Sequence, residues 1–410
     1  MKKGWETKKL KEVCEKITDG THQTPKYFDK GIIFLSSKNV TSGKIDWENV
    51  KYIDEKQHLE MHRRVAPKMN DILLAKNGTT GVAAIVDRNE VFDIYVSLAH
   101  IRVLEEIMPH FMLYFLNSPL AKRQFDRRLK GIGVPNLHLE EIREVVIPFP
   151  KSLEEQKQIV AILDKAFAAI DRAKANVAQN LRNANELFES YLNEVFENKG
   201  EGWEETTLEN IVSTDCTLSY GIVQPGDEFE NGLPIVRPTD LNSKIIFKEG
   251  LKLVNPERAD SYSRTTLKGG DILMCVRGTT GTISIASTEL KGANVTRGIV
   301  PINFNSKILD QSFGYYLLKS NYIQKQIRKK TYGAALMQIN IGDLRKIRVL
   351  YPPLLQQKRF VQKFDIGSTQ THRLDLVYGR KIADLEELKK SILQKAFSGE
   401  LTHKPIHEQV

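Results

Sequence analysis

The chain is an internal duplication, because its most recognisable segments occur twice, about 200 residues apart. NDILLAKNGTTG at residues 70–81 returns as GDILMCVRGTTG at residues 270–281. FPKSLEEQKQIV at residues 149–160 is echoed by YPPLLQQKRFV at residues 351–361. An offset that changes so little along half a chain indicates duplication of a whole domain, since solenoid repeats are much shorter. The chain therefore predicts two related domains, and two copies of one binding module suggest a ligand that is read at two places.

Composition narrows the class of ligand. The 410 residues include 60 Lys and Arg against 51 Asp and Glu, which gives a net charge of +9 and a pI near 9.1. A basic chain favours a polyanionic partner such as nucleic acid. Three cysteines without paired spacing argue against a disulfide framework or a zinc site and fit a reducing compartment. The N-terminus lacks an apolar signal core and no run of about 18 apolar residues occurs, so we expect a cytoplasmic protein without a membrane segment.

The first 150 or so residues of each half predict mixed β structure with short helices. Short apolar runs flank the turns KNGTTG and RGTTG, a pattern typical of strand, turn and strand. Residues 111–120 then carry apolar side chains at spacings of three and four, which predicts an amphipathic helix.

The remainder of each half predicts one long helix. Residues 153–196 contain no proline or glycine, and their apolar residues alternate in steps of four and three, which is the seam of a coiled coil. The expected seam positions are Ile159, Leu163, Ala166, Ile170, Ala173, Val177, Ala184, Leu187, Tyr191 and Val195, with Asn180 in one slot. Residues 356–397 repeat the stripe at Phe364, Thr371, Leu374, Tyr378, Leu385, Leu388 and Ile392, weakened by Gly367 and Gly379.

Two such helices could pack antiparallel as a rigid spacer between the domains, since thirty-six helical residues span about 54 Å at 1.5 Å per residue. The alternative is that each helix packs only on its own domain. The fold class that we expect is α+β, with two duplicated mixed α/β domains separated by two long antiparallel coiled-coil helices. The expected boundaries are a domain at 1–152, a helix at 153–198, a domain at 199–354, a helix at 355–400 and a tail at 401–410.

The combination of these segments resembles the specificity subunit of a type I restriction-modification system. The resemblance rests on TDGTHQTP, GIIFLSSKNV, the DIL…GTTG hairpin, LEEQKQIVAILD and the closing LKKSILQKAFSGEL, and it covers residues 4–401. It implies two target recognition domains, at residues 4 to about 150 and 202 to about 353, each reading one half of a split double-stranded DNA sequence. The halves diverge, for example where TDGTHQTP faces LSYGIVQP, so we expect an asymmetric target.

The resemblance also implies where the chemistry of the complex lies. The long helices would dock two methyltransferase (modification) subunits that carry S-adenosylmethionine, and restriction/translocase subunits would bring ATP and Mg. The sequence itself has no glycine-rich cofactor loop, no phosphate loop and no metal-ligand spacing, and YPPL at residues 351–354 lacks the Asn or Asp of an amino-methyltransferase motif. We therefore expect a non-catalytic subunit without a metal or cofactor. The alternative is a two-domain protein-binding adaptor whose basic patches face acidic proteins.

Two groups of residues could read base edges. The GTTG turns offer Lys76, Asn77 and Arg277, since Arg and Lys suit guanine and Asn suits adenine. They also offer the hydroxyls of Thr79, Thr80, Thr279 and Thr280. The alternative is an ordinary hairpin in which glycine supplies a positive φ. The amide-rich segments at residues 133–142 and 335–344 place Asn136 and His138 opposite Gln338 and Asn340, although such residues also cap turns.

A third group is basic and suits phosphates. Two clusters occupy equivalent places, so that Arg127 and Arg128 align with Lys329 and Lys330. Phosphate contacts require surface Lys or Arg but no particular arrangement. The alternative is that both clusters are solvated helix faces.

Overall fold

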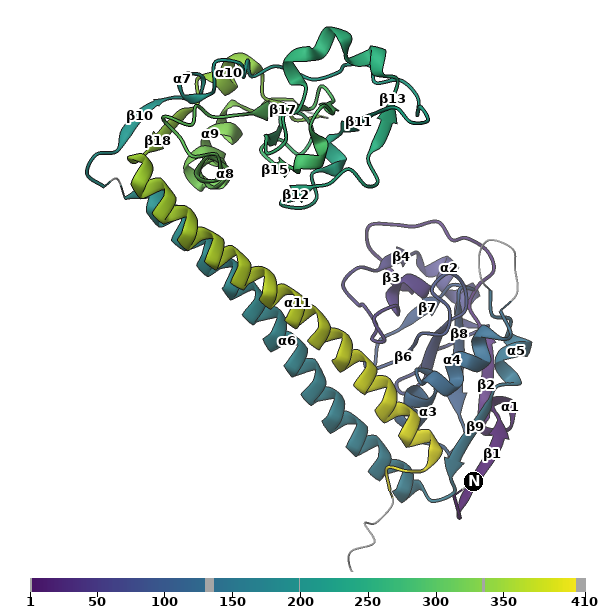
Figure 1. The fold of residues 1–410 in the computed structure, drawn as a ribbon. Helices are drawn as coiled ribbons and strands as arrows, with labels where there is room; N and C mark the ends of the chain where they lie inside the picture. The colour runs from purple at the N-terminus through teal and green to yellow at the C-terminus, as the bar shows by residue number, and fades with distance from the viewer. Residues whose placement is uncertain (1, 130–135, 199, 334–335, 403–410) are drawn as a thin grey trace, which may run out of the picture. The chain divides into compact units, whose positions relative to one another are not determined.

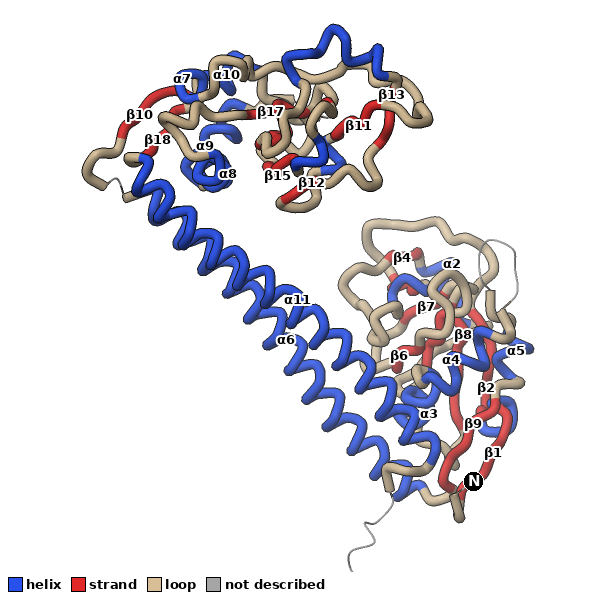
Figure 2. Tube along the Cα trace, in the orientation of Figure 1, coloured by secondary structure: helices blue, strands red, loops and turns tan. Residues whose placement is uncertain are grey.

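The computed structural model describes residues 2–129, 136–198, 200–333 and 336–402, and it divides into two compact units. Unit 1 comprises Met1–Val177 and Gly379–Val410, and unit 2 comprises Ala178–Tyr378. Each unit contains one domain of short strands joined by long loops, together with segments of the two long helices (Figures 1 and 2).

The domain of unit 1 contains three small sheets. The largest has the order β2-β8-β5-β6 and is antiparallel; its strands are β2 (Cys14–Asp19), β8 (Leu98–Val103), β5 (Ile72–Ala75) and β6 (Ala83–Ile85). The second has the order β4-β3-β7, in which β3 and β7 are parallel; its strands are β4 (Lys51–Ile53), β3 (Ile32–Leu35) and β7 (Phe92–Ile94). In the third, β1 (Trp5–Lys9) pairs with β9 (Val146–Pro150), which holds the two ends of the domain together. The helices are α1 (Leu10–Val13), α2 (Glu55–His62), α3 (Pro109–Leu116), α4 (Pro119–Asp126) and α5 (Leu139–Arg143), with a short 3-10 helix η1 (Ser37–Asn39).

Strand β5 is buried on both faces, which explains why its sequence is a continuous apolar run. Ile72 and Leu74 point into a core formed with α3, α4 and the long helices, whereas Leu73 and Ala75 point into a second core beneath β3 and β7. The alternation follows from the two-residue period of a strand. The hairpin predicted from the sequence is therefore the centre of the domain.

Unit 2 repeats this plan with one change at the edge of the main sheet. The sheet order is β12-β15-β14-β17, from strands β12 (Ile245–Ile246), β15 (Ile283–Ala286), β14 (Ile272–Cys275) and β17 (Ile299–Ile302). In unit 1 the extra strand is β2, which joins β8, whereas in unit 2 it is β12, which joins β15 in parallel. The other strands are β13 (Lys252–Val254), β11 (Leu233–Val236), β16 (Asn294–Val295) and the pair β10 (Glu204–Thr207) and β18 (Arg348–Tyr351). The helices are α7 (Leu208–Ile211), α8 (Gln311–Lys319), α9 (Asn321–Lys330), α10 (Ile341–Arg345) and the 3-10 helices η2 (Pro238–Asp240), η3 (Pro256–Thr265) and η4 (Thr288–Leu290).

The two long helices, α6 (Leu153–Glu197) and α11 (Leu354–Ser398), are 45 residues each and pack antiparallel inside both units. In unit 1, Asp171 pairs with Lys389, and the ring of Phe397 packs on Phe111 and Phe115 of the domain. In unit 2, the rings of Tyr191 and Phe364 lie 5.8 Å apart. The α+β class with antiparallel long helices is thus confirmed. No helix within the described residues is both long and apolar enough to cross a membrane.

The predicted seam is wrong at three positions, one of which is Asn180, an exposed residue that the pattern placed in a seam slot. Leu187 is 73% exposed and Leu388 is 47% exposed, although the steps of four and three placed both in the core. Phe188 occupies the inward position beside Leu187 and packs against Tyr316. A straight helix has 3.6 residues per turn, so a 3.5-residue repeat extrapolated along it drifts out of phase.

A buried glutamine fastens the start of each long helix to its domain, and this explains the repeated motif EEQKQIV/LQQKRFV. Gln156 accepts a hydrogen bond from the backbone nitrogen of Met108 at 2.8 Å and donates to the carbonyls of Glu106 and Pro150. Gln357 makes the same three contacts with Asp310, Ile308 and Pro352. Both side chains are completely buried, and buried polar groups are normally hydrogen-bonded, as these are.

We expect Gln156→Leu to lower the free energy of unfolding by about 2–5 kcal/mol, because it leaves one buried N–H and two buried carbonyls without partners. Chemical denaturation of the full chain measures the loss. Gln158→Leu is the control, because Gln158 lies two residues further along the same helix and is exposed. A loss below about 1 kcal/mol would show that water replaces the amide and that the clamp is unimportant.

Candidate functional site

The two GTTG turns have the same geometry in both units. In each turn the first glycine accepts from the second threonine, Thr80 N to Gly78 O and Thr280 N to Gly278 O, at 2.9 and 2.8 Å. Gly78 and Gly81 have φ of 75° and 83°, and Gly278 and Gly281 have 94° and 92°, all in the region that favours glycine. Thr79 and Thr279 are exposed and Thr80 is partly exposed, while the Thr280 hydroxyl donates to the Met337 carbonyl. The turns are hairpin turns as expected, and their tips are accessible.

The structure brings the two groups of candidate base-reading residues together. Asn77 forms a β-bridge with Asn136 in unit 1, and Arg277 forms one with Gln338 in unit 2. Backbone hydrogen bonds extend the pairing, from Leu137 N to Lys76 O at 2.8 Å and from Ile339 N to Val276 O at 3.0 Å. Segments about 60 residues apart in sequence thus form one surface, which we call the turn–amide site. Residues 133–135 of the first amide-rich segment and residue 335 of the second lie outside the described residues.

Unsatisfied polar atoms concentrate at the turn–amide sites. Six buried side-chain polar atoms of the described residues have no hydrogen-bond partner, and three of them are Asn77 Oδ1, Asn136 Oδ1 and Arg277 Nε. Buried polar atoms are normally paired, so an unpaired group calls for an explanation. Arg277 also has no ion pair with any acidic side chain in the part of the chain that the structure describes. The hydrogen-bonding capacity of these residues is therefore not consumed inside their own domains.

The expectation that Lys76 reaches a base edge needs correction. Lys76 is only 6% exposed, and its ammonium lies 3.0 Å from Asp19 Oδ2. Asp19 also accepts from Arg64 Nη2 at 2.7 Å and lies 3.3 Å from His22 Nε2. Burial raises the pKa of Asp19, but the hydrogen bonds from Arg64 and Lys76 outweigh it and lower the pKa, which keeps the carboxylate ionised. Lys76 thus holds TDGTHQTP to the hairpin rather than pointing to solvent.

The segments TDGTHQTP and LSYGIVQP both lie against the second sheet of their unit. Thr21 N donates to Ile94 O at 3.0 Å, and Ile222 N donates to Val295 O at 2.8 Å. The preceding glycines are required, because a Cβ on Gly20 or Gly221 would lie about 2 Å from these carbonyl oxygens (1.9 and 2.0 Å). With Gly20 aligned to Gly221, Asp19 faces Tyr220, and in the aligned GTTG turns Lys76 faces Val276, so the ion pair of unit 1 cannot form in unit 2. The surroundings of the two turn–amide sites therefore differ chemically.

Two of the amide-rich candidates stand at helix starts. Asn340 is the N-cap of α10, since its Oδ1 accepts from Asp343 N at 2.7 Å while its Nδ2 donates to Asp343 Oδ2. Its amide is thus used in a cap, which is the alternative that the sequence left open. His138 occupies the N-cap position of α5 without a side-chain cap and is exposed.

The basic clusters end helices α4 and α9, and only part of each is available. Arg128 donates to the carbonyls of Gln124 and Glu144, and Lys330 lies 3.6 Å from Asp343 Oδ1. Arg127 and Lys329 are exposed, and neither has an ion pair among the described residues. Cations at a helix C-terminus are also favoured by the helix dipole. Arg127 and Lys329 are therefore the members of these clusters that are free to contact an external anion.

Arg64 and the exposed apolar residues beside the site of unit 2 lie near the sites without having been predicted from the sequence. Arg64 is half exposed and forms an ion pair with Asp19. The two residues are 45 positions apart in the sequence, so only the fold brings Arg64 to TDGTHQTP. Tyr332, Leu336 and Met337 are 48%, 46% and 45% exposed, next to the bridge between Arg277 and Gln338. Tyr332 exchanges two backbone hydrogen bonds with Gln338, at 2.9 and 2.8 Å. No local sequence pattern marks these residues, because their role depends on their neighbours in space.

The family model described as "Type I restriction modification DNA specificity domain" matches the chain twice, at residues 2–180 and 200–373. The chain is 27% identical to the type I restriction enzyme EcoBI specificity subunit of Escherichia coli over 294 residues, which is 66% of this chain and 62% of that protein. The match thus spans less than two thirds of that relative's length. The chain is 24% identical over 432 residues to the putative type I restriction enzyme MjaX specificity subunit of Methanocaldococcus jannaschii, covering 97% of this chain and 93% of that one.

Solved structures agree with the fold. One, from a study of complex assembly and conformational transition of the type I R-M system, superposes with a TM-score of 0.76 at 20% identity and covers 98% of this chain and 99% of its own. The crystal structure of the HsdS subunit from Thermoanaerobacter tengcongensis superposes with a TM-score of 0.55 at 21% identity and covers 98% of both chains.

Proposed function

Because the chain belongs to the family of type I restriction-modification DNA specificity subunits, we propose that its two units each read one half of a bipartite DNA target whose halves differ in sequence. The observation that carries this proposal is the pair of turn–amide sites. They are built on equivalent backbone bridges, yet Asn77 with Asn136 stands where Arg277 with Gln338 stands in the other unit. A shared scaffold with different side chains is what two readers of different sequences require.

The residue types indicate what each site would prefer. Asn suits the N6 and N7 edge of adenine, whereas Arg suits the O6 and N7 edge of guanine, each with two hydrogen bonds. Arg277 has no acidic partner in the described part of the chain, and its Nε is unpaired. We infer that Arg277 contacts guanine in one half-site and that Asn77 contacts adenine in the other.

Arg127 and Lys329 would bind phosphates rather than bases. Both are exposed at the ends of helices that follow the hairpin in equivalent places. Phosphate contacts set the position and the affinity of a protein on DNA but do not depend on sequence.

We expect the two groups to respond differently to substitution. Arg127→Ala with Lys329→Ala should weaken binding to every duplex alike and reduce the slope of log K against log salt by about one unit for each lost contact. Arg277→Ala should cost about 1–3 kcal/mol on the cognate duplex alone, because a base edge and not a phosphate loses its partner. Affinity titrations at several salt concentrations, on cognate and scrambled duplexes, measure both effects.

Arg264→Ala is a matched control, since Arg264 is an exposed arginine of η3 in the same unit as Arg277. Equal losses of affinity on both duplexes for Arg277→Ala would show that the RGTTG turn is an ordinary hairpin without a role in base recognition. A salt slope near zero for the unaltered chain would contradict DNA binding and would favour the protein-binding adaptor.

The long helices would dock the methyltransferase subunits. Helix α11 carries four exposed apolar side chains at intervals of eleven residues, with Leu355 66%, Ile366 59%, Val377 51% and Leu388 47% exposed. Eleven residues are close to three turns, so the four positions form one stripe along the helix. We call it the α11 stripe. Exposed apolar side chains on a regular stripe support a role as a protein contact.

Catalysis would be carried out by the partner subunits. Methyl transfer with S-adenosylmethionine and ATP-dependent motion with Mg are assigned to the methyltransferase and restriction/translocase subunits, and this chain contributes recognition without a catalytic group. Helices of 45 residues are about 67 Å long at 1.5 Å per residue, which is long enough to act as a spacer between two half-sites.

A further inference from the structure

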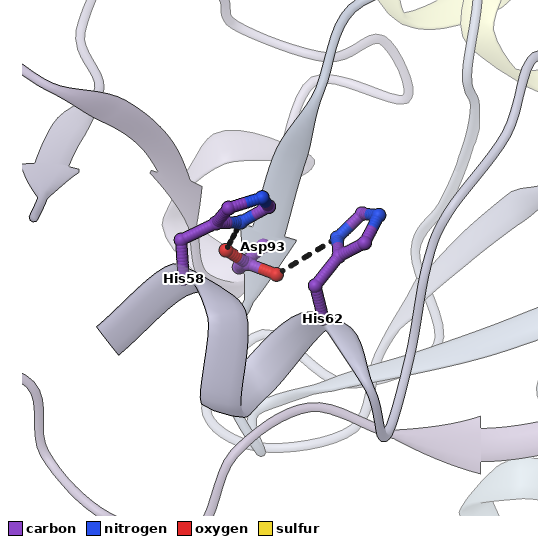
Figure 3. A group of neighbouring side chains, drawn as sticks. All are labelled: His58, His62 and Asp93. Carbon is purple, nitrogen blue, oxygen red and sulfur yellow. Dashed lines mark hydrogen bonds and ion pairs between the residues drawn. The ribbon is translucent and has the colours of Figure 1, made fainter. Parts of the chain in front are cut away.

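Two histidines and an aspartate of unit 1 converge at a place that the proposed function does not use. His58 and His62 lie one turn apart on α2, and Asp93 lies on β7 (Figure 3). His58 Nδ1 is 2.7 Å from Asp93 Oδ2, and His62 Nδ1 is 3.2 Å from Asp93 Oδ1. The three potential ligand atoms all lie within 4.8 Å of one another.

The Asp93 carboxylate needs compensation for its burial. Its side chain is 1% exposed, and among the described residues the carboxylate has hydrogen bonds and ion pairs only with the two imidazoles. Transferring an isolated carboxylate out of water is very costly, so a buried one is normally paired with a cation or bound to a metal. No Lys or Arg of the described residues lies within ion-pair distance of Asp93.

Helix α2 depends on this cluster for its attachment. None of its eight residues is fully buried, so apolar packing fixes it only weakly. The contact of His58 and His62 with Asp93 joins it to the sheet, and Gln57 joins it to the backbone of Lys26.

The duplication supplies an internal comparison. Asp93 pairs with Phe34 in the parallel strands β7 and β3, and Asn294 pairs with Ile235 at the equivalent place in unit 2. Asn294 is buried and satisfied by neutral groups: its Oδ1 accepts from the Thr265 hydroxyl at 2.7 Å, and its Nδ2 donates to the Tyr262 carbonyl. The fold therefore does not require a carboxylate or histidines at this position. The carboxylate and the two histidines of unit 1 therefore need an explanation other than the stability of the fold.

We propose that His58, His62 and Asp93 bind a divalent transition-metal ion of the zinc type. Two imidazole nitrogens and one carboxylate oxygen are ligands that suit zinc, whereas magnesium and calcium prefer oxygen alone. Ligand atoms of a tetrahedral zinc site lie about 3.3 Å apart for bonds of about 2.0–2.1 Å. The two Nδ1–oxygen separations, 2.7 Å to Oδ2 and 3.2 Å to Oδ1, are close to this value, and one ligand atom from each residue lies within 4.8 Å of the other two.

The site is partly open to solvent. The side chains of His58 and His62 are 14% and 32% exposed, which leaves room for water in a fourth coordination position. Coordination through Nδ1 requires that nitrogen to carry no proton, so each imidazole would bind as the neutral tautomer with its proton on Nε2. The metal would tie α2 to β7 and stabilise unit 1.

The signal in the sequence was HLEMH at residues 58–62, in which two histidines four residues apart share one helix face. The expectation of no metal-ligand spacing overlooked it, because the third ligand is 31 residues further along the chain. Two histidines at this spacing on a helix are common without a metal. Only the buried Asp93 beneath them, as a third ligand, indicates a metal site.

Zinc and cobalt(II) binding to the full chain, prepared without a polyhistidine tag, tests the proposal. We expect one equivalent of zinc that survives gel filtration, visible d–d absorption on cobalt loading, and a rise in Tm that chelation reverses. His62→Ala should weaken binding by at least about 10-fold and remove the cobalt band, since it removes one of three ligands. Asp93→Asn, which introduces the residue of unit 2, should do the same in a chain that stays folded by circular dichroism.

His22→Ala is the control, because His22 is an exposed histidine of the same unit that lies outside the cluster, with a side-chain exposure of 63%. It should bind zinc as the unaltered chain does. Failure of the unaltered chain to retain zinc or to develop the cobalt band would overturn the proposal. So would retention of full binding by both His62→Ala and Asp93→Asn, because the ion would then sit elsewhere.

Discussion

Exchange of residues 4–150 for the corresponding domain of a relative is expected to replace one half of the DNA target completely and to leave the other half unchanged. The reason is that each turn–amide site is assembled within one unit, from residues of that unit alone. The donor should be chosen to keep aromatic residues at the positions of Phe111 and Phe115, since both pack on Phe397 of α11. The methylated motif, mapped in cells that supply the modification subunits, is the readout.

The reciprocal exchange of residues 202–353 is the control and should change only the other half. A change in both halves, or in neither, would mean that the domains do not read DNA separately.

Ile366→Glu with Val377→Glu is expected to prevent stable assembly with the methyltransferase subunits. Both side chains are more than half exposed in this chain, so the charges are tolerated in isolation. At an apolar interface each would become a buried, unpaired charge, which costs about 3–5 kcal/mol, and the pair should weaken assembly by more than about 100-fold. Copurification and sedimentation with the modification subunits measure the loss.

His372→Glu is the matched control, because His372 is exposed on α11 but lies well away from the α11 stripe around the helix. DNA half-site binding by the isolated chain should be unaffected in both variants. Normal assembly of the Ile366→Glu, Val377→Glu chain would show that the α11 stripe is not the docking surface.

Much of the fold follows from local patterns in the sequence. The apolar runs beside GTTG predict the hairpin because a central strand buries both of its faces, as Ile72 and Leu73 do in two separate cores. Helix α6 follows from 44 residues without proline or glycine, at 153–196. The packing of the long helices was only partly predictable, because the aromatic Phe188, and not Leu187, is the inward residue and packs against Tyr316 of α8.

The sites were less predictable because they are made of residues distant in sequence. The sequence identified Asn77, Arg277 and their amide partners as separate candidates, but not that each pair is joined by a bridge. It also placed Lys76 at the surface, whereas Asp19, 57 residues earlier, holds the ammonium inside. Burial of a charged side chain depends on a partner that only tertiary structure reveals.

The position of the metal cluster illustrates the same limit. His58 and His62 share a helix face, but Asp93 reaches them only through the parallel pairing of β3 and β7. The equivalent Asn294 shows that the fold accepts a neutral residue there. A difference between two copies of one domain is therefore a better guide to a special site than any motif within one copy.

The most direct test of the account is the methylated motif made by cells that express this chain with its modification subunits. We expect two specified blocks of different sequence, separated by a run of unspecified bases of constant length, with guanine in one block lost when Arg277 is replaced by alanine. A single contiguous motif, or a palindromic one, would contradict the conclusion that two divergent units read two different half-sites.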